Sequence, residues 1–161
     1  MRPAPAPGPA RALALGVPVA LLAGAYFFQY AVGLAPCEMC WWQRYPLFAA
    51  LFFAGLALPV RRVGFPLVAV AALCILASGL IGGFHAGVEY GWWQGLTACT
   101  GNAAGEGADP LASVMGAPLI RCDVAPWKLA GISLAGFNFL ISVPAALAIF
   151  VQLFKRLGEW P

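Results

Sequence analysis

Four long apolar runs dominate this sequence and limit what the chain can fold into. They cover about residues 12–35, 41–60, 64–84 and 129–154. A helix needs roughly 20 apolar residues to cross a hydrocarbon core, and each run is about that long. Only 9% of the residues are charged, against about 25% in an average soluble chain, so the composition excludes a soluble domain. The sequence therefore predicts an all-α membrane protein, a four-transmembrane-helix bundle.

The segments outside the runs are two short tails and one long loop. Residues 1–11 are rich in Pro and Ala and are expected to form a disordered tail, and residues 155–161 form the other tail. Residues 85–128 form a polar, Gly-rich loop, within which 110–120 is too short to span and is expected to lie on the surface. A cleaved signal peptide is the rival for the first run. It is disfavoured because the run exceeds an apolar region of about 7–15 residues and lacks a cleavage site.

Basic residues gather on one side of the predicted bundle. Four spans place both termini and the turn between the second and third runs on the same side. Six of the nine Lys and Arg residues lie there: Arg2, Arg11, Arg61, Arg62, Lys155 and Arg156. The positive-inside rule makes this side the cytoplasm. The opposite boundary carries an interfacial tryptophan belt, made of Trp41, Trp42, Trp92, Trp93 and Trp127.

Four of the five cysteines lie on the outer side in this topology: Cys37, Cys40, Cys99 and Cys122. In a bacterium that side is the periplasm, where thiols are readily oxidised. In a bacterium the predicted location would thus be the inner membrane, with periplasmic cysteine loops. Cys74 lies within the third run without polar neighbours and is expected to act as a small buried hydrophobe.

The two outer cysteine pairs call for different explanations. A structural disulfide suits Cys99 and Cys122, because a bridge there would staple a long loop. It suits Cys37 and Cys40 poorly, since closing so small a ring removes little chain entropy. Small Cys-x-x-Cys rings are more often redox-active. Four sulfurs also suggest zinc, but the second Cys-x-x-Cys of a zinc ribbon is missing, so we predict no metal site.

Three polar residues near the outer boundary are further candidates. Arg44 follows Cys40 by one helical turn, so the two share a face. Either Arg44 reaches lipid headgroups, or it stabilises a Cys40 thiolate and the anion of a lipid-soluble acceptor such as a quinone. His85 is explained equally well by a hydrogen bond to a loop carbonyl and by a role in quinone binding or protonation. Glu89 is expected to be solvated.

The Cys-x-x-Cys-x-x-x-Arg arrangement of residues 37–44, at the start of the second run, resembles the disulfide bond formation protein B (DsbB) family. The four predicted spans and the long outer loop with a second cysteine pair are similar to that family too. So are the phrases FHAGVEYGWW at 84–93 and GISLAGFN at 131–138. The resemblance extends from about residue 15 to 154, and the combination of motifs is more specific than any one of them.

The resemblance implies an inner-membrane oxidoreductase that reoxidises a periplasmic thioredoxin-like protein of the DsbA type. It implies that Cys99, with Cys122 as its partner, receives electrons from that protein. The electrons would then pass through a transient Cys37–Cys99 bridge to the Cys37–Cys40 pair. Cys40 would face the acceptor, ubiquinone or menaquinone, assisted by Arg44 and by His85.

Two other classes of protein remain open at this point. A vitamin K epoxide reductase-like enzyme would use similar thiols and a similar substrate, but there the order of the cysteine motifs is expected to be reversed. A non-enzymatic four-span protein would keep both cysteine pairs as structural disulfides and would ignore quinone.

Overall fold

The computed structural model describes residues 6–59, 64–96 and 121–158 of the chain, without the side chains of 156–158. Its elements, in chain order, are the helices α1 (Gly8–Tyr30), α2 (Glu38–Leu56) and α3 (Gly64–Glu89), the strands β1 (Lys128–Leu129) and β2 (Ile132–Ser133), and helix α5 (Leu134–Gly158). Cys99 and the predicted surface segment 110–120 lie outside the described residues.

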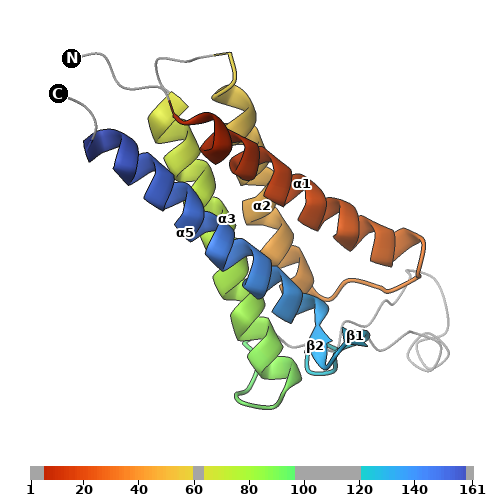
Figure 1. Ribbon diagram of the computed structural model, residues 1–161. Coiled ribbons are helices and arrows are strands. Elements are labelled where there is room, and N and C mark those ends of the chain that lie inside the picture. The colour runs from red at the N-terminus through yellow and green to blue at the C-terminus, as the bar shows by residue number, and fades with distance from the viewer. Residues whose placement is uncertain (1–5, 60–63, 97–120, 159–161) are drawn as a thin grey trace, which may run out of the picture.

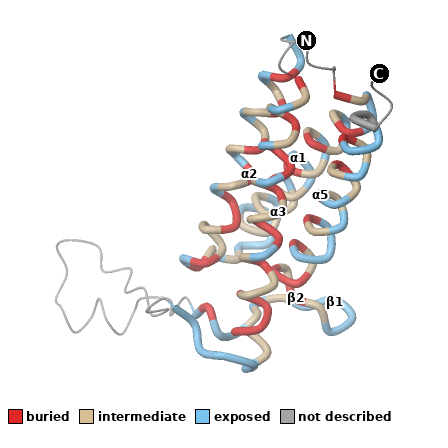
Figure 2. The backbone as a smooth tube through the Cα atoms, turned by 90° about the vertical axis from the view of Figure 1, so that its left-hand side faces the viewer, coloured by how far each residue is buried: buried red, intermediate tan, exposed pale blue. Residues whose placement is uncertain are grey.

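The helices form an elongated bundle, in which α3 packs against both α2 and α5, and α1 packs across α2 and α5 (Figure 1). One end of the bundle, the upper end in Figure 1, holds the start of α1 and the end of α5. The end of α2 and the start of α3 lie there as well. The start of α2, the end of α3 and the β-hairpin lie at the other. Buried residues face the interior of the bundle, and exposed ones face outward (Figure 2).

Three helices of the described part are long and apolar enough to cross a membrane: Gly8–Tyr30, Gly64–Glu89 and Leu134–Lys155. The prediction of an all-α membrane protein is confirmed to this extent. α2 has 19 residues and carries Gln43 and Arg44 in its first half, which lowers its apolar character. Its role as a fourth span stays a prediction.

The first helix begins earlier than the first apolar run. α1 starts at Gly8, so residues 8–11 are helical, although they fall within the predicted tail. Proline in the first turn explains this start, because the donors of that turn have no partners inside the helix and the fixed φ of proline suits it. The buried residues Ala10, Ala14, Pro18 and Leu22 then follow at intervals of four along one face.

The fourth apolar run begins with a hairpin instead of a helix. β1 and β2 pair antiparallel across a two-residue turn, in which Ala130 has φ 50° and Gly131 has φ 81°. Two consecutive residues with positive φ are typical of the tight turns that suit the twist of a hairpin. A right-handed helix cannot pass through them, so α5 starts at Leu134 and not at Leu129.

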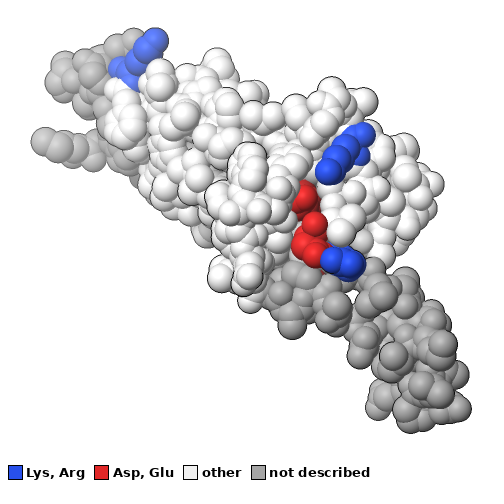
Figure 3. Space-filling view, turned by 90° about the horizontal axis from the view of Figure 1, so that it is seen from below, with Lys and Arg blue, Asp and Glu red and all other residues white. Residues whose placement is uncertain are grey.

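The hairpin is fastened to the end of α3 by Tyr90. Its hydroxyl donates to the carbonyl oxygen of Gly131 at 2.9 Å and accepts from the backbone N–H of Ser133 at 3.1 Å. The described surface at this end is mostly uncharged, with a few acidic and basic side chains (Figure 3). The hairpin therefore covers the end of the bundle where α2 begins.

Candidate functional site

The Cys-x-x-Cys pair lies in the first turn of α2. Cys37 is the N-cap residue in an extended conformation, and its Sγ accepts the backbone N–H of Cys40 at 3.3 Å. The two Sγ atoms are 2.9 Å apart, with the Cys37 thiol donating to Cys40. This hydrogen bond, together with burial, raises the pKa of Cys37. Within the pair, the Cys37 thiol is therefore the hydrogen-bond donor and the Cys40 sulfur is the acceptor.

Arg44 is 6% exposed and is held between α1 and α2. Its guanidinium donates to Oε1 of Gln29 at 2.6 Å and to the carbonyl oxygen of Ala25 at 3.3 Å. It also lies over the rings of Tyr26 and Trp41, with 5.0 Å and 4.9 Å to their centroids. In the structure the guanidinium thus bonds to α1 inside the bundle and does not extend outward. Its contacts with α1 fix the position of the positive charge, one turn of α2 after Cys40.

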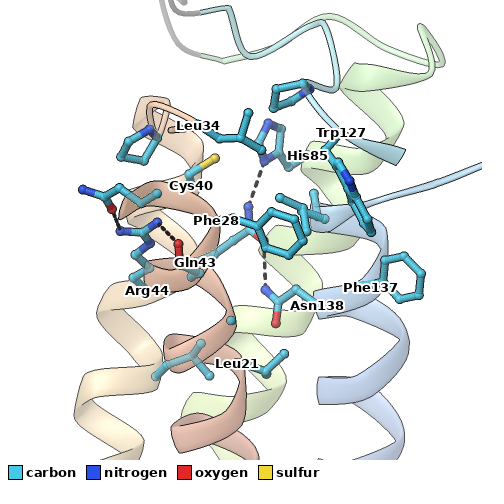
Figure 4. Close-up of a pocket in the computed structure, with 18 of the residues that line it drawn as sticks. Leu21, Phe28, Leu34, Cys40, Gln43, Arg44, His85, Trp127, Phe137 and Asn138 are labelled. Carbon is cyan, nitrogen blue, oxygen red and sulfur yellow. Dashed lines mark hydrogen bonds between the residues drawn. The ribbon is translucent and has the colours of Figure 1, made fainter. Parts of the chain in front are cut away.

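Gln43 connects three helices through its buried amide. Its Nε2 donates to the carbonyl oxygen of Met39 at 3.2 Å and lies 2.8 Å from Nδ1 of His85 (Figure 4). Its Oε1 accepts from Nδ2 of Asn138 at 2.9 Å. A carbonyl only accepts, so the contact with Met39 orients the amide and assigns Nδ1 of His85 as an acceptor. The imidazole is then neutral, and its proton is on Nε2, which lies 3.7 Å from Sγ of Cys37.

Asn138 extends this polar network into the bundle. Its Nδ2 donates to the carbonyl oxygen of Ser78 at 3.1 Å, and its Oδ1 accepts from the hydroxyl of Ser142 at 2.8 Å. The hydroxyl of Ser78 donates to the carbonyl oxygen of Gln43 at 2.8 Å. All four of these residues are buried. Sequence reasoning missed Gln43 as a site residue, although a polar side chain inside an apolar run was a usable signal.

The side chain of Glu89 is buried, contrary to the expectation of a solvated carboxylate. Its side chain is 3% exposed, and Oε1 lies 3.8 Å from Nε2 of His85. Ser133 of β2 and Lys128 of β1 are the neighbouring polar groups on the hairpin. The hairpin explains why this carboxylate is not solvated, because it covers the end of α3 where the sequence predicted exposure to water.

Cys122 is 1% exposed and packs in a cluster with Cys37, Met39 and Val88. One cysteine of the predicted loop pair therefore lies beside the Cys-x-x-Cys pair. The structure brings five of the six predicted site residues to the same end of the bundle: Cys37, Cys40, Arg44, His85 and Cys122. The sixth, Cys99, is the one outside the described residues, so its pairing stays a prediction.

A pocket of ≈ 380 Å³ opens beside Cys40. Most of its wall is apolar, and Phe28 of α1 meets Trp127 at one side with ring centroids 4.8 Å apart. Its polar groups converge from α1, α2, α3 and α5: Gln29, Cys40, Gln43, Arg44, His85, Glu89 and Asn138 (Figure 4). An apolar wall with a few convergent polar groups is the usual form of a small-molecule site.

The sulfurs of Cys37 and Cys40 and a ring nitrogen of His85 lie within 4.8 Å of one another. Two thiolates and an imidazole form a donor set that suits a soft metal ion. However, the Gln43 amide places the imidazole proton on Nε2, the nitrogen that faces the sulfurs. This tautomer opposes metal binding, and the predicted absence of a metal stays a prediction.

Comparisons with known proteins agree with the motifs. The model of the family described as "Disulfide bond formation protein DsbB" matches residues 8–152. The chain is 32% identical to "Disulfide bond formation protein B" of Polaromonas sp., covering 88% of this chain and 86% of that protein. It is also 32% identical to proteins of that name from Verminephrobacter eiseniae (84% and 79% covered) and Aromatoleum aromaticum (86% and 87% covered). No solved structure matches.

Proposed function

Because this chain belongs to the disulfide bond formation protein B family, we propose that it reoxidises a periplasmic DsbA-type dithiol protein and passes the electrons to ubiquinone or menaquinone. Membership in the family implies disulfide oxidoreductase activity in a membrane protein. The observation that carries the finer proposal is the position of Cys40. Its sulfur lies between the sulfur of Cys37 on one side and, on the other, an apolar pocket that is also lined by Arg44.

The proposed path starts in the outer loop. A thiolate of the partner attacks the Cys99–Cys122 disulfide, and exchange leaves the partner oxidised and both loop cysteines reduced. A loop thiolate then attacks the Cys37–Cys40 disulfide, through a transient Cys37–Cys99 bridge, and becomes oxidised again. The burial of Cys122 against Cys37 supports this second step, because exchange requires the two pairs to come into contact.

The path ends at the pocket, where a bound quinone would supply a two-electron acceptor. Cys40 lines this pocket, so its sulfur would be the one that faces the acceptor. Arg44 would stabilise negative charge developing on an acceptor oxygen, since its own position is fixed by α1. Nε2 of His85 lies 3.7 Å from the Cys37 sulfur, and its proton would stabilise a thiolate there in addition to the hydrogen bond that the imidazole makes with the backbone of Cys122.

The proposed topology has four spans, with both termini in the cytoplasm and residues 85–128 in the periplasm. Two observations support it. The ends of α1 and α5 that lead to the termini lie together at the end of the bundle opposite the cysteines (Figure 1). α2 runs alongside α3 in close contact, as a fourth span would. In this arrangement the domain comprises residues 12–154, flanked by the two short tails.

The experiment is a two-substrate assay on the purified protein in detergent. Reduced DsbA-type protein and a short-chain ubiquinone are added, and partner thiols and quinol are both measured. We expect one quinol for each partner disulfide, no turnover in Cys40→Ser, and normal turnover in the matched control Cys74→Ser. A wild-type protein that oxidises no partner and reduces no quinone would favour the structural-disulfide alternative and overturn the proposal.

A further inference from the structure

A buried carboxylate in the pocket has no part in the path above. The Glu89 side chain is 3% exposed and lines the pocket together with Cys40 and His85. Its Oε2 has no hydrogen-bond partner within the part of the chain that the structure describes. Burying a polar oxygen without a partner costs free energy, so a natural site that retains one calls for an explanation. An unsatisfied buried polar group in a native structure often marks a catalytic role.

His85 cannot carry a proton between the thiols and the pocket while its present contacts hold. Its Nδ1 accepts from Gln43, and its Nε2 already bears the ring proton. Taking up a second proton would place two donors face to face at the 2.8 Å contact with Gln43. Turning the Gln43 amide would instead oppose its oxygen to the Met39 carbonyl and lose the bond from Asn138. His85 is therefore a hydrogen-bond donor with a fixed tautomer.

This proposal rests on the proposed function and deepens it: we propose that Glu89 is the proton carrier between the Cys37–Cys40 dithiol and the quinone. Oxidation of the two thiols to a disulfide releases two electrons and two protons, and reduction of quinone to quinol consumes both. The Glu89 carboxylate accepts one proton from the dithiol and delivers it to a quinone oxygen, and the second proton is exchanged with water. It thereby returns to its starting state, and no outside acid or base is consumed by this step.

The groups around Glu89 suit a carboxylate that alternates between two protonation states. The titratable and charged groups that face it are His85 on its own helix, Cys40 of α2 and Lys128 of β1. Burial favours the protonated form, whereas a hydrogen bond with the Ser133 side chain and the charge of Lys128 favour the ionised form. The polar side chains that α1 and α5 contribute to the pocket, Gln29 and Asn138, are neutral. Neither form is held by a short ion pair in the described residues.

The test isolates the quinone half-reaction. The protein is reduced with dithiothreitol, freed of reductant and mixed with a short-chain ubiquinone, and the loss of quinone absorbance is followed over a range of pH. In the wild-type protein the rate should rise with pH as Glu89 ionises. In Glu89→Gln the rate should no longer rise with pH in this way. It should also be about 10²-fold lower, which is the usual size of a general acid–base contribution. The Kd for quinone should stay within twofold.

Two further variants give the controls. Glu38→Gln removes an exposed carboxylate from the first turn of α2, outside the pocket, and should retain the wild-type rate and pH profile. Glu89→Asp keeps a carboxylate and should recover the rise of the rate with pH, which also covers the case in which Glu89→Gln does not fold.

The possible failures are distinct. A Glu89→Gln protein with the wild-type rate and profile, or one whose slower rate follows entirely from weaker quinone binding, would overturn the role of Glu89 and leave the proposed function intact. A wild-type protein that reduces no quinone would overturn the proposed function itself.

Discussion

Nε2 of Gln43 lies 2.8 Å from Nδ1 of His85, and this contact between α2 and α3 decides how the site can work. The same amide nitrogen donates to the Met39 carbonyl, so its orientation is fixed. It follows that the ring proton of His85 is on Nε2, which lies 3.7 Å from the sulfur of Cys37, while the imidazole also hydrogen-bonds to the backbone of Cys122. A side chain that the sequence shows only as an interruption of an apolar run thus controls the tautomer of the only histidine.

Gln43→Leu should therefore destabilise the bundle and disturb the site together. It removes the partners of His85 Nδ1 and one bond of Asn138, and it leaves these buried groups unsatisfied. We expect a loss of about 1–3 kcal/mol in the free energy of unfolding. Denaturation in detergent, followed by circular dichroism, measures it. The matched control is Gln152→Leu: Gln152 Oε1 is buried without a partner in the described structure, so its loss should cost nothing. Equal losses in both variants would contradict the network.

Arg44→Ala should raise the KM for quinone by about tenfold, equivalent to about 1.4 kcal/mol of lost interaction. The guanidinium is held toward the pocket by Gln29 and Ala25, and alanine removes its charge without touching the cysteines. Steady-state kinetics with varied quinone at fixed partner concentration measure this change, and the KM for the partner should not move.

The control for this variant is Arg121→Ala, since Arg121 is exposed, pairs with Asp123 and lies outside the pocket. It should keep the wild-type KM for quinone. Unchanged quinone kinetics in Arg44→Ala would count against the assigned role of Arg44.

Cys122→Ala should accumulate a mixed disulfide between Cys99 and the partner protein, because the cysteine that would resolve it is gone. Non-reducing electrophoresis detects the adduct, and mass spectrometry of its peptides identifies the bonded cysteine. Cys74→Ala should form no adduct. A partner found on Cys37 in place of Cys99 would reverse the proposed order of transfer.

In the reduced protein, Cys37 should react with iodoacetamide more slowly than Cys40 at pH 8. The thiolate is the reactive form, and a raised pKa means that less of it is present at a given pH. The rate for Cys37 should therefore rise only at higher pH. Peptide mass spectrometry after timed alkylation measures both rates.

Cys40→Ala gives the reference for the Cys37 thiol, because it removes the sulfur that receives the hydrogen bond and puts no acceptor in its place. It should shift the alkylation of Cys37 toward lower pH. A Cys37 that reacts as fast as Cys40 in the wild-type protein would show that this hydrogen bond does not form in solution.

The sequence by itself determined the class of the protein and most of the site. Long apolar runs predict membrane helices because the length of a span is a local property of the chain. Likewise, the spacing of Cys37, Cys40 and Arg44 predicts a shared helical face, since a helical turn is set by neighbouring residues. These features need no knowledge of what packs against them.

Only the tertiary structure decided how the site is completed. The burial of Glu89 depends on the hairpin at 128–133, and the tautomer of His85 depends on Gln43, which is 42 residues away in sequence. The hairpin itself displaced the predicted start of the fourth helix through two positive-φ residues. Such contacts arise between segments far apart in the chain, so they follow from the packing of the bundle and not from any local pattern.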